Sequence, residues 1–161
     1  MEINIIDFGA LIAEIALIYE PLAENQGIVI DTEISDSLPS IQGDRARLMQ
    51  CLQNLMDNAI RHTPAGGSVR ISLHKQADSL LLCVSDTGSG IAAEHLPNIF
   101  ERFYRADLAR ARLTGGTGLG LSNVRRLAAD CGANIRVTSQ PGHGTTFTLS
   151  FPLPDTGDDA S

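Results

Sequence analysis

The sequence predicts an α+β domain folded as a two-layer α/β sandwich, in which helices pack against one sheet. Helical and strand-like patterns are segregated along the 161 residues and do not alternate strictly, which disfavours a doubly wound parallel sheet. Hydrophobic residues make up 43% of the chain and charged residues 19%, so there is enough apolar surface to close one core.

Three segments have the apolar spacing of long helices. The first is Asp7–Asn25, which begins with an aspartate that can cap it. The second is Arg45–His62, which follows a second capping residue, Asp44, and ends before a Pro-Ala-Gly-Gly sequence. The third is Gly118–Cys131, and a short helix is expected over 93–100.

Five segments have the pattern of strands: Ile28–Ile34, Val69–Leu73, Leu80–Ser85, Ile135–Ser139 and Thr145–Phe151. The second and third form a hairpin through a turn at Gln76–Ser79. Val69–Leu73 alternates and has one solvated face, whereas the continuous apolar run that follows predicts a strand buried on both faces. Residues 35–43, which contain a proline, are expected to form a loop.

The formal charge of −7 argues against a partner that is bound by neutralising many phosphates, such as nucleic acid. No apolar run approaches the ~18 residues of a membrane span, and the N-terminus shows no secretory signal, so a cytoplasmic location is expected. Cys51, Cys83 and Cys131 lie far apart among apolar residues, which favours buried reduced thiols.

Eight of the fifteen glycines occur in three clusters: Gly88 and Gly90; Gly115, Gly116, Gly118 and Gly120; Gly142 and Gly144. Such clusters indicate backbone that takes positive φ or approaches another group closely. The middle cluster opens a predicted helix, where unpaired N–H groups favour a phosphate. Leu121-Ser122 stands where a P-loop requires Lys-Ser/Thr, and a flexible hinge is the alternative interpretation.

Asn54, Asn58 and Arg61 share one stripe of the second helix, roughly opposite its apolar face. Asparagine is a weak helix former, so two in a helix interior indicate that their carboxamides bind something. An amide oxygen is a suitable ligand for Mg²⁺. A solvated helix face would give the same pattern.

Asp86 directly follows a predicted buried strand, so its carboxylate is expected at the edge of the sheet, where it could accept a hydrogen bond from an exocyclic amine. A simple Asx-turn is the alternative. An EF-hand calcium loop is excluded because glycines and a proline occupy its ligand positions, and the four histidines show no metal-ligand or triad spacing.

Together these segments resemble the N, G1, F, G2 and G3 boxes of sensor histidine kinases, in order: Asn54–His62, Asp86–Ile91, Phe100–Arg105, Gly116–Leu121 and Gly142–Phe147. The resemblance implies the catalytic ATP-binding domain of that family, a Bergerat fold shared with gyrase-like ATPases. It adds to the predicted fold a mixed, mostly antiparallel sheet, three helices and a mobile ATP lid, which is expected in the stretch without periodicity at 107–116.

The resemblance also implies roles for individual residues. Asn54 and Asn58 would face the phosphates, with Asn58 binding Mg²⁺, and Asp86 would accept from the adenine amino group beside Thr145. Asn54, Arg61 and Arg105 are the candidate catalytic residues. The remaining expected nucleotide contacts are His62, Gly88, Gly90, Ile91, Arg102, Gly116, Thr117, Gly118, Leu119, Gly120 and Leu121. Arg61 departs from the lysine that is usual in the family.

The implied activity is transfer of the γ-phosphoryl group of Mg·ATP to a histidine on a separate dimerisation domain, with a response regulator downstream. Asn54 cannot take a proton from water as the glutamate of hydrolytic relatives does, so slow hydrolysis is expected. Residues 1–154 would form the domain, which is expected to be monomeric, and residues 155–161 a disordered acidic tail.

The phosphoacceptor and sensor domains would belong to the rest of a parent protein that is anchored in the bacterial inner membrane. Three other hypotheses stay open at this stage. They are an ATP-driven clamp, a serine kinase that binds a sigma factor, and a nucleotide-binding module without transfer activity.

Overall fold

The computed structural model describes residues 3–36, 38–91, 94, 96, 99–100 and 120–153, and these form two layers. One layer is a sheet of five strands in the order β2-β4-β5-β7-β6. The strands are β2 (Val29–Ile34), β4 (Ser68–Gln76), β5 (Ser79–Asp86), β6 (Asn134–Ser139) and β7 (Thr145–Pro152). Only β2 and β4 pair in parallel, so the expected mixed, mostly antiparallel sheet is confirmed.

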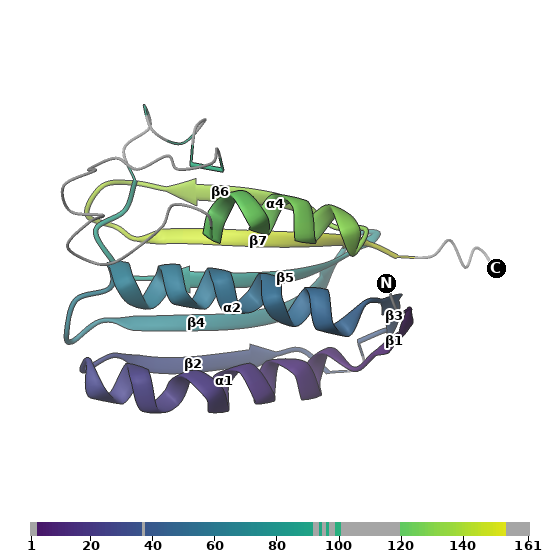
Figure 1. Cartoon of the computed structure of the whole chain (residues 1–161), viewed down its shortest axis with the longest axis horizontal. Coiled ribbons are helices and arrows are strands. Elements are labelled where there is room, and N and C mark those ends of the chain that lie inside the picture. The colour runs from purple at the N-terminus through teal and green to yellow at the C-terminus, as the bar shows by residue number, and fades with distance from the viewer. Residues whose placement is uncertain are drawn as a thin grey trace.

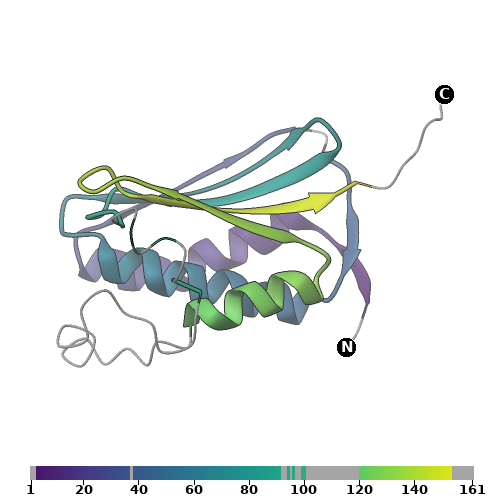
Figure 2. The same ribbon diagram turned by 90° about the horizontal axis from the view of Figure 1, so that it is seen from above.

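The other layer consists of α1 (Phe8–Asn25), α2 (Arg45–His62) and α4 (Gly120–Asp130), which all lie on one face of the sheet (Figures 1 and 2). Both predicted caps are present. Oδ1 of Asp7 accepts the N–H of Ala10 at 3.1 Å, and Oδ1 of Asp44 accepts the N–H of Arg47 at 3.2 Å. Within the described residues, no helix has both the length and the apolar character needed to cross a membrane.

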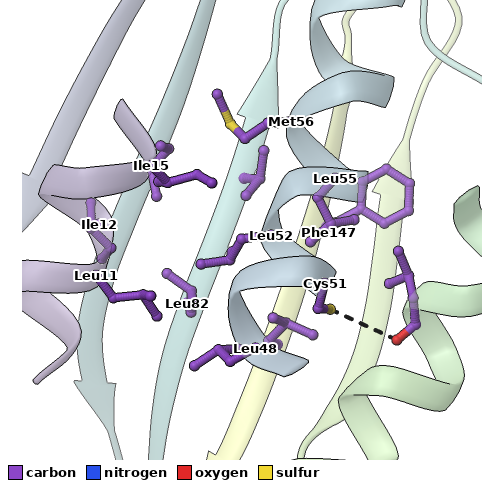
Figure 3. Packing of buried hydrophobic residues seen from close by; sticks show 14 of the residues in the cluster. Leu11, Ile12, Ile15, Leu48, Cys51, Leu52, Leu55, Met56, Leu82 and Phe147 are labelled. Carbon is purple, nitrogen blue, oxygen red and sulfur yellow. Dashed lines mark hydrogen bonds between the residues drawn. The ribbon is translucent and has the colours of Figure 1, made fainter. Parts of the chain in front are cut away.

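The core lies between α2 and the sheet, with α1 and α4 on either side of α2 (Figure 3). The largest fully buried side chains include residues of two helices and of the sheet: Leu11, Ile12 and Ile15 on α1; Leu48, Leu52, Leu55 and Met56 on α2; Phe147 and Phe151 on β7. The thiol of Cys51 lies 3.8 Å from the carbonyl oxygen of Val124, which joins α2 to α4. The central helix is therefore fixed on three sides.

The prediction of a loop over residues 35–43 is wrong at its C-terminal end. Residues Ile41–Gly43 form the short strand β3, which pairs antiparallel with β1, Asn4–Ile6. Neither three-residue strand was expected. A segment of that length contains too few residues to show alternation, and its partner lies far away in the sequence.

The expectation that Leu80–Ser85 is buried on both faces is also wrong. Leu80, Leu82 and Val84 are buried under the helices, whereas Leu81, Cys83 and Ser85 are half-buried on the other face. The reason is that all three helices lie on one side of the sheet, so even a central strand keeps one face towards solvent (Figure 2).

The core makes a direct prediction about stability. Leu52 is fully buried, so Leu52→Ala is expected to lower the free energy of unfolding by about 2–5 kcal/mol. The control is Leu17→Ala, because 71% of Leu17 is exposed on α1 and its loss is expected to cost less than about 0.5 kcal/mol. Urea unfolding followed by circular dichroism measures both, and similar costs for the two variants would contradict this core.

Candidate nucleotide-binding site

The predicted site segments meet at one end of the sandwich. The C-terminus of α2, the end of β5 and the start of β7 lie at the left-hand end of the molecule in Figure 1, and the start of α4 is the end of that helix nearer to them. Two turns close this end. Residues 87–91 follow β5, and residues 140–144 join β6 to β7. The two turns are hydrogen-bonded, because the N–H of Gly142 donates to the carbonyl oxygen of Ser89 at 2.7 Å.

At this end the helix-facing side of the sheet changes from apolar to polar. Strand register places Val84, Phe147 and Val137 side by side in one row across β5, β7 and β6. The next row towards the end of the sheet consists of Asp86, Thr145 and Ser139. We call these three residues the polar row.

Asp86 is the last residue of β5, whereas the sequence predicted it directly after the strand, and only 6% of it is exposed. Its Oδ1 accepts the N–H of Gly88 at 2.8 Å, which is the Asx-turn that the sequence left open. Burial raises the pKa of the Asp86 carboxyl, while the backbone N–H groups of Gly88 and Thr145 lower it to a smaller extent. A carboxylate can accept about four hydrogen bonds, so these two donors leave capacity for a ligand.

Asn54, Asn58 and Arg61 of α2 differ in how far they are exposed to solvent. Asn58 is 8% exposed, Asn54 is half-buried, and only Arg61 in the last turn is exposed. The alternative interpretation, a solvated helix face, is therefore wrong for Asn58. Because α2 is the middle helix of its layer, its neighbours also cover its flanks, and a helical wheel of α2 alone does not show this.

Asn58 is the buried polar side chain whose environment is hardest to explain by folding alone. Among the described residues, its carboxamide has no hydrogen-bond partner. An unpaired buried amide costs about 1–3 kcal/mol, and such a group in a native protein calls for an explanation, such as a catalytic role or a bound water or ion. A ligand or metal ion at this end of α2 would satisfy it.

Two glycines of the turn after β5 are required by the protein itself. A Cβ at Gly88 would collide with the carbonyl oxygen of His62 at the end of α2. Gly90 has φ of +78°, and a Cβ there would collide with the carbonyl oxygen of Gln140 in the β6–β7 turn. The close approach that the glycine cluster predicted is thus at least partly between segments of the chain.

Sequence reasoning missed Ser139. Its hydroxyl accepts the N–H of Ile91 at 2.7 Å, donates to the carbonyl oxygen of Gly144 at 2.8 Å, and lies 2.9 Å from the Thr145 hydroxyl. One signal was available. Alternation along β6 places Ser139 on the same face as Ile135 and Val137, where a hydroxyl needs a partner.

The other predicted contacts are only partly described. Gly120 is the first residue of α4, and Leu121 and Ile91 are half-buried against the core. His62 is exposed at the end of α2 and has an interacting partner. The following lie outside the described residues: Arg102, Arg105, Gly116, Thr117, Gly118, Leu119, the predicted lid at 107–116 and the tail at 155–161, as does most of the short helix expected over 93–100.

The profile of the family described as "Histidine kinase-, DNA gyrase B-, and HSP90-like ATPase" matches residues 43–155, which includes every described part of this end of the sandwich. The chain belongs to this family. The resemblance drawn from the sequence motifs is thereby confirmed, and ATP is the ligand that the family implies for the site.

The similar curated proteins are sensor kinases. The chain is 40% identical to the sensor-like histidine kinase SenX3 of Mycolicibacterium smegmatis over 151 residues, which are 94% of the chain and 39% of SenX3. It is 42% identical to the phosphate regulon sensor protein PhoR of Pseudomonas aeruginosa over 118 residues, 72% of the chain and 27% of PhoR. The chain thus spans well under half the length of these relatives.

Solved structures give the same fold. Full-length ShkA in complex with AMPPNP superimposes with a TM-score of 0.83 at 33% identity, over 94% of this chain and 31% of ShkA. The catalytic domain of the histidine kinase ThkA, in a nucleotide-free form, gives 0.82 at 27% identity, over 94% of this chain and 96% of that domain. The predicted sandwich is therefore the fold of histidine kinase catalytic domains.

The crowding at Gly88 leads to a prediction with a matched control. Gly88→Ala is expected to lower the free energy of unfolding by about 1–3 kcal/mol and to weaken ATP binding, because the turn must move away from α2. Gly9→Ala lies inside α1 with only ordinary contacts around the new methyl group, so it is expected to stabilise the protein by about 0.5–1 kcal/mol. Urea unfolding and titration calorimetry measure both, and equal effects would show that the turn does not pack on α2.

Because the Asp86 carboxyl is buried, we expect its substitution to raise the stability of the nucleotide-free protein and to weaken ATP binding. Its raised pKa means that the folded chain binds a proton there more readily than the unfolded chain, so stability falls as the pH rises from the unfolded pKa through the folded one. At neutral pH, Asp86→Asn is therefore expected to raise the Tm of the nucleotide-free protein, and this gain should vanish below about pH 3, where both states are protonated.

The same Asp86→Asn variant is expected to bind ATP about tenfold more weakly and to discriminate less against GTP, since a charged acceptor is lost. Asp31→Asn, at an exposed position of β2, is the control and should change neither quantity. Calorimetric titration with ATP and GTP provides the measurement. An unchanged preference for ATP would remove Asp86 from the contact with the base.

Proposed function

We propose that this chain is the catalytic ATP-binding domain of a sensor histidine kinase, which transfers the γ-phosphoryl group of ATP to a histidine on the dimerisation domain of its parent protein. The observation that carries the proposal is the buried carboxamide of Asn58, unpaired within the described chain, on the same helix as Asn54. An amide oxygen suits Mg²⁺, and an amide at Asn54 cannot act as a base towards water.

The residues present fit Mg²⁺. Asn58 would hold the ion, and the bound ion would neutralise charge on the phosphate oxygens and orient them. Asn54, half-buried one turn earlier on α2, would face the same phosphates, and Arg61 in the exposed last turn would offer them a guanidinium. We assign Arg105, together with the glycines of 116–120, to the phosphates on the resemblance alone.

Asp86 and Thr145 of the polar row would bind the base. The ionised carboxylate of Asp86 can only accept hydrogen bonds. The amino group of adenine is a hydrogen-bond donor and therefore matches it. Phosphoryl transfer would then depend on positioning and charge neutralisation, with the attacking imidazole supplied by the partner domain. The absence of a carboxylate at Asn54 would keep bound ATP from being hydrolysed before that domain arrives.

The remainder of the parent supplies the other functions in this proposal. The chain spans 39% of SenX3, which leaves room for a dimerisation domain and a sensor domain. We infer that a response regulator receives the phosphoryl group and that a membrane-anchored segment holds the parent. The domain bounds at residues 1–154 and the monomeric state belong to the same proposal.

A transfer assay tests the function. The chain, the parent's histidine-bearing domain and γ-labelled ATP are mixed with Mg²⁺, and the label is followed by gel and by acid treatment. Acid-labile label on the histidine domain supports the proposal. Acid-stable label on a serine would make the chain a serine kinase, and ATP binding without any transfer would leave only a nucleotide-binding module.

The Mg²⁺ site has its own prediction. Asn58→Ala is expected to remove the Mg²⁺-dependent part of ATP affinity in calorimetric titrations and to slow transfer by about 100-fold, since the loss of residues that support a metal commonly costs 10–100-fold. Asn134→Ala, at an exposed position of β6, is the matched control and should behave as the wild type. A variant at Asn58 that still responds fully to Mg²⁺ would overturn the assignment.

A further inference from the structure

The hydrogen-bonding partners of Ser139 determine where its hydroxyl donates and where it accepts. The carbonyl oxygen of Gly144 can only accept, so Ser139 must donate its single proton in that 2.8 Å bond. The N–H of Ile91 can only donate, so one lone pair of the Ser139 oxygen is used at 2.7 Å. The remaining lone pair faces the hydroxyl of Thr145 at 2.9 Å.

It follows that Thr145 is the donor in the pair of hydroxyls. Its proton points to Ser139, and its oxygen presents only lone pairs to a group that approaches from the site. Thr145 stands next to Asp86 in the polar row and is 6% exposed. The two side chains therefore offer a ligand acceptors and no donor.

We infer that Ser139 is a positioning residue for base specificity: by taking the proton of Thr145, it makes the polar row select a base that carries an amino group over one that carries an oxo group. This inference rests on the proposed function, because it deepens the assignment of the base contact at the same site. Ser139 itself need not touch the nucleotide. It acts through the hydroxyl of Thr145 and through its hydrogen bond to Ile91, the last residue of the turn at 87–91.

The experiment compares ATP with ITP, which carries a 6-oxo group in place of the 6-amino group. In Ser139→Ala the Thr145 hydroxyl can rotate and donate to that oxo group. The dissociation constant for ITP divided by that for ATP is therefore expected to fall by about tenfold, which is the effect of about one hydrogen bond. Ser139→Thr retains a hydroxyl and is expected to restore the ratio. Calorimetric titration at one fixed Mg²⁺ concentration measures each variant.

A matched control lies on the other face of the sheet. Ser85 and Thr146 form the same kind of hydroxyl pair at 2.7 Å, on strands β5 and β7 but away from the helices. Ser85→Ala is expected to leave the ratio for ATP and ITP unchanged. If it narrows the ratio as much as Ser139→Ala does, the effect is a general one of the sheet and the inference fails.

The outcomes separate a positioning role from a purely structural one. A structural role would weaken ATP and ITP equally, so an unchanged ratio in Ser139→Ala overturns the inference while leaving wild-type binding and transfer, and hence the proposed function, intact. Loss of ATP binding or of transfer in the wild type would instead overturn the proposed function.

If Ser139→Ala does not fold, Thr145→Val carries the test. It removes the fixed hydroxyl from an otherwise similar shape, and a narrowed ratio supports the inference, whereas an unchanged ratio overturns it. Where both single variants fold, the double variant should narrow the ratio no further than either one, because both remove the same acceptor.

Discussion

The site depends on the register between β5 and β7. Alternation along a strand has a period of two, so a shift of either strand by one residue would turn its own polar residue, Asp86 of β5 or Thr145 of β7, to the open face of the sheet. The apolar rows of Val84 with Phe147 and Leu82 with Leu149 prevent that shift, because it would also turn the buried apolar side chains of the shifted strand to the open face. The core thus fixes where the carboxyl group of Asp86 is buried, and this burial raises its pKa.

Along helix α2, the polar side chains differ in whether they have partners within the described residues. At its N-terminus, Arg47 forms ion pairs with the capping residue Asp44 at 3.4 Å and with Asp130 of α4 at 2.7 Å. On the side that faces α1, the hydroxyl of Tyr19 donates to Asp57, the residue before Asn58, at 2.7 Å. Near its C-terminus lies the Asn58 carboxamide, which has no such partner among the described residues. Charged and polar groups away from the site hold the helix in place, and the polar group at the site is left for a ligand.

The sequence predicted the long helices, their caps and the end of β5 because these features depend on local pattern. Asp7 and Asp44 cap helices whose apolar spacing extends over several turns, and Asp86 follows an uninterrupted apolar strand. What it could not predict depends on tertiary neighbours. The three-residue strands β1 and β3 are recognisable only as a pair, and the burial of Asn58 arises from the position of α2 between two other helices. Ser139 gains its importance from Ile91 and Gly144, which approach it only in the folded chain.

The end of the sandwich that we propose as the base-binding end is built from contacts within the protein, which bears on how affinity would arise there. Gly88 lies against the end of α2, Gly90 against the β6–β7 turn, and Ser139 joins both turns to Thr145. These segments contact one another in the absence of a ligand, so the free-energy cost of ordering them when a base binds is small. Discrimination between bases then depends on which groups donate and which accept, and not on a change of shape. In the role that we infer for it, the Ser139 hydroxyl fixes the direction of the Thr145 proton, so it would influence which base the domain prefers without needing to touch the nucleotide.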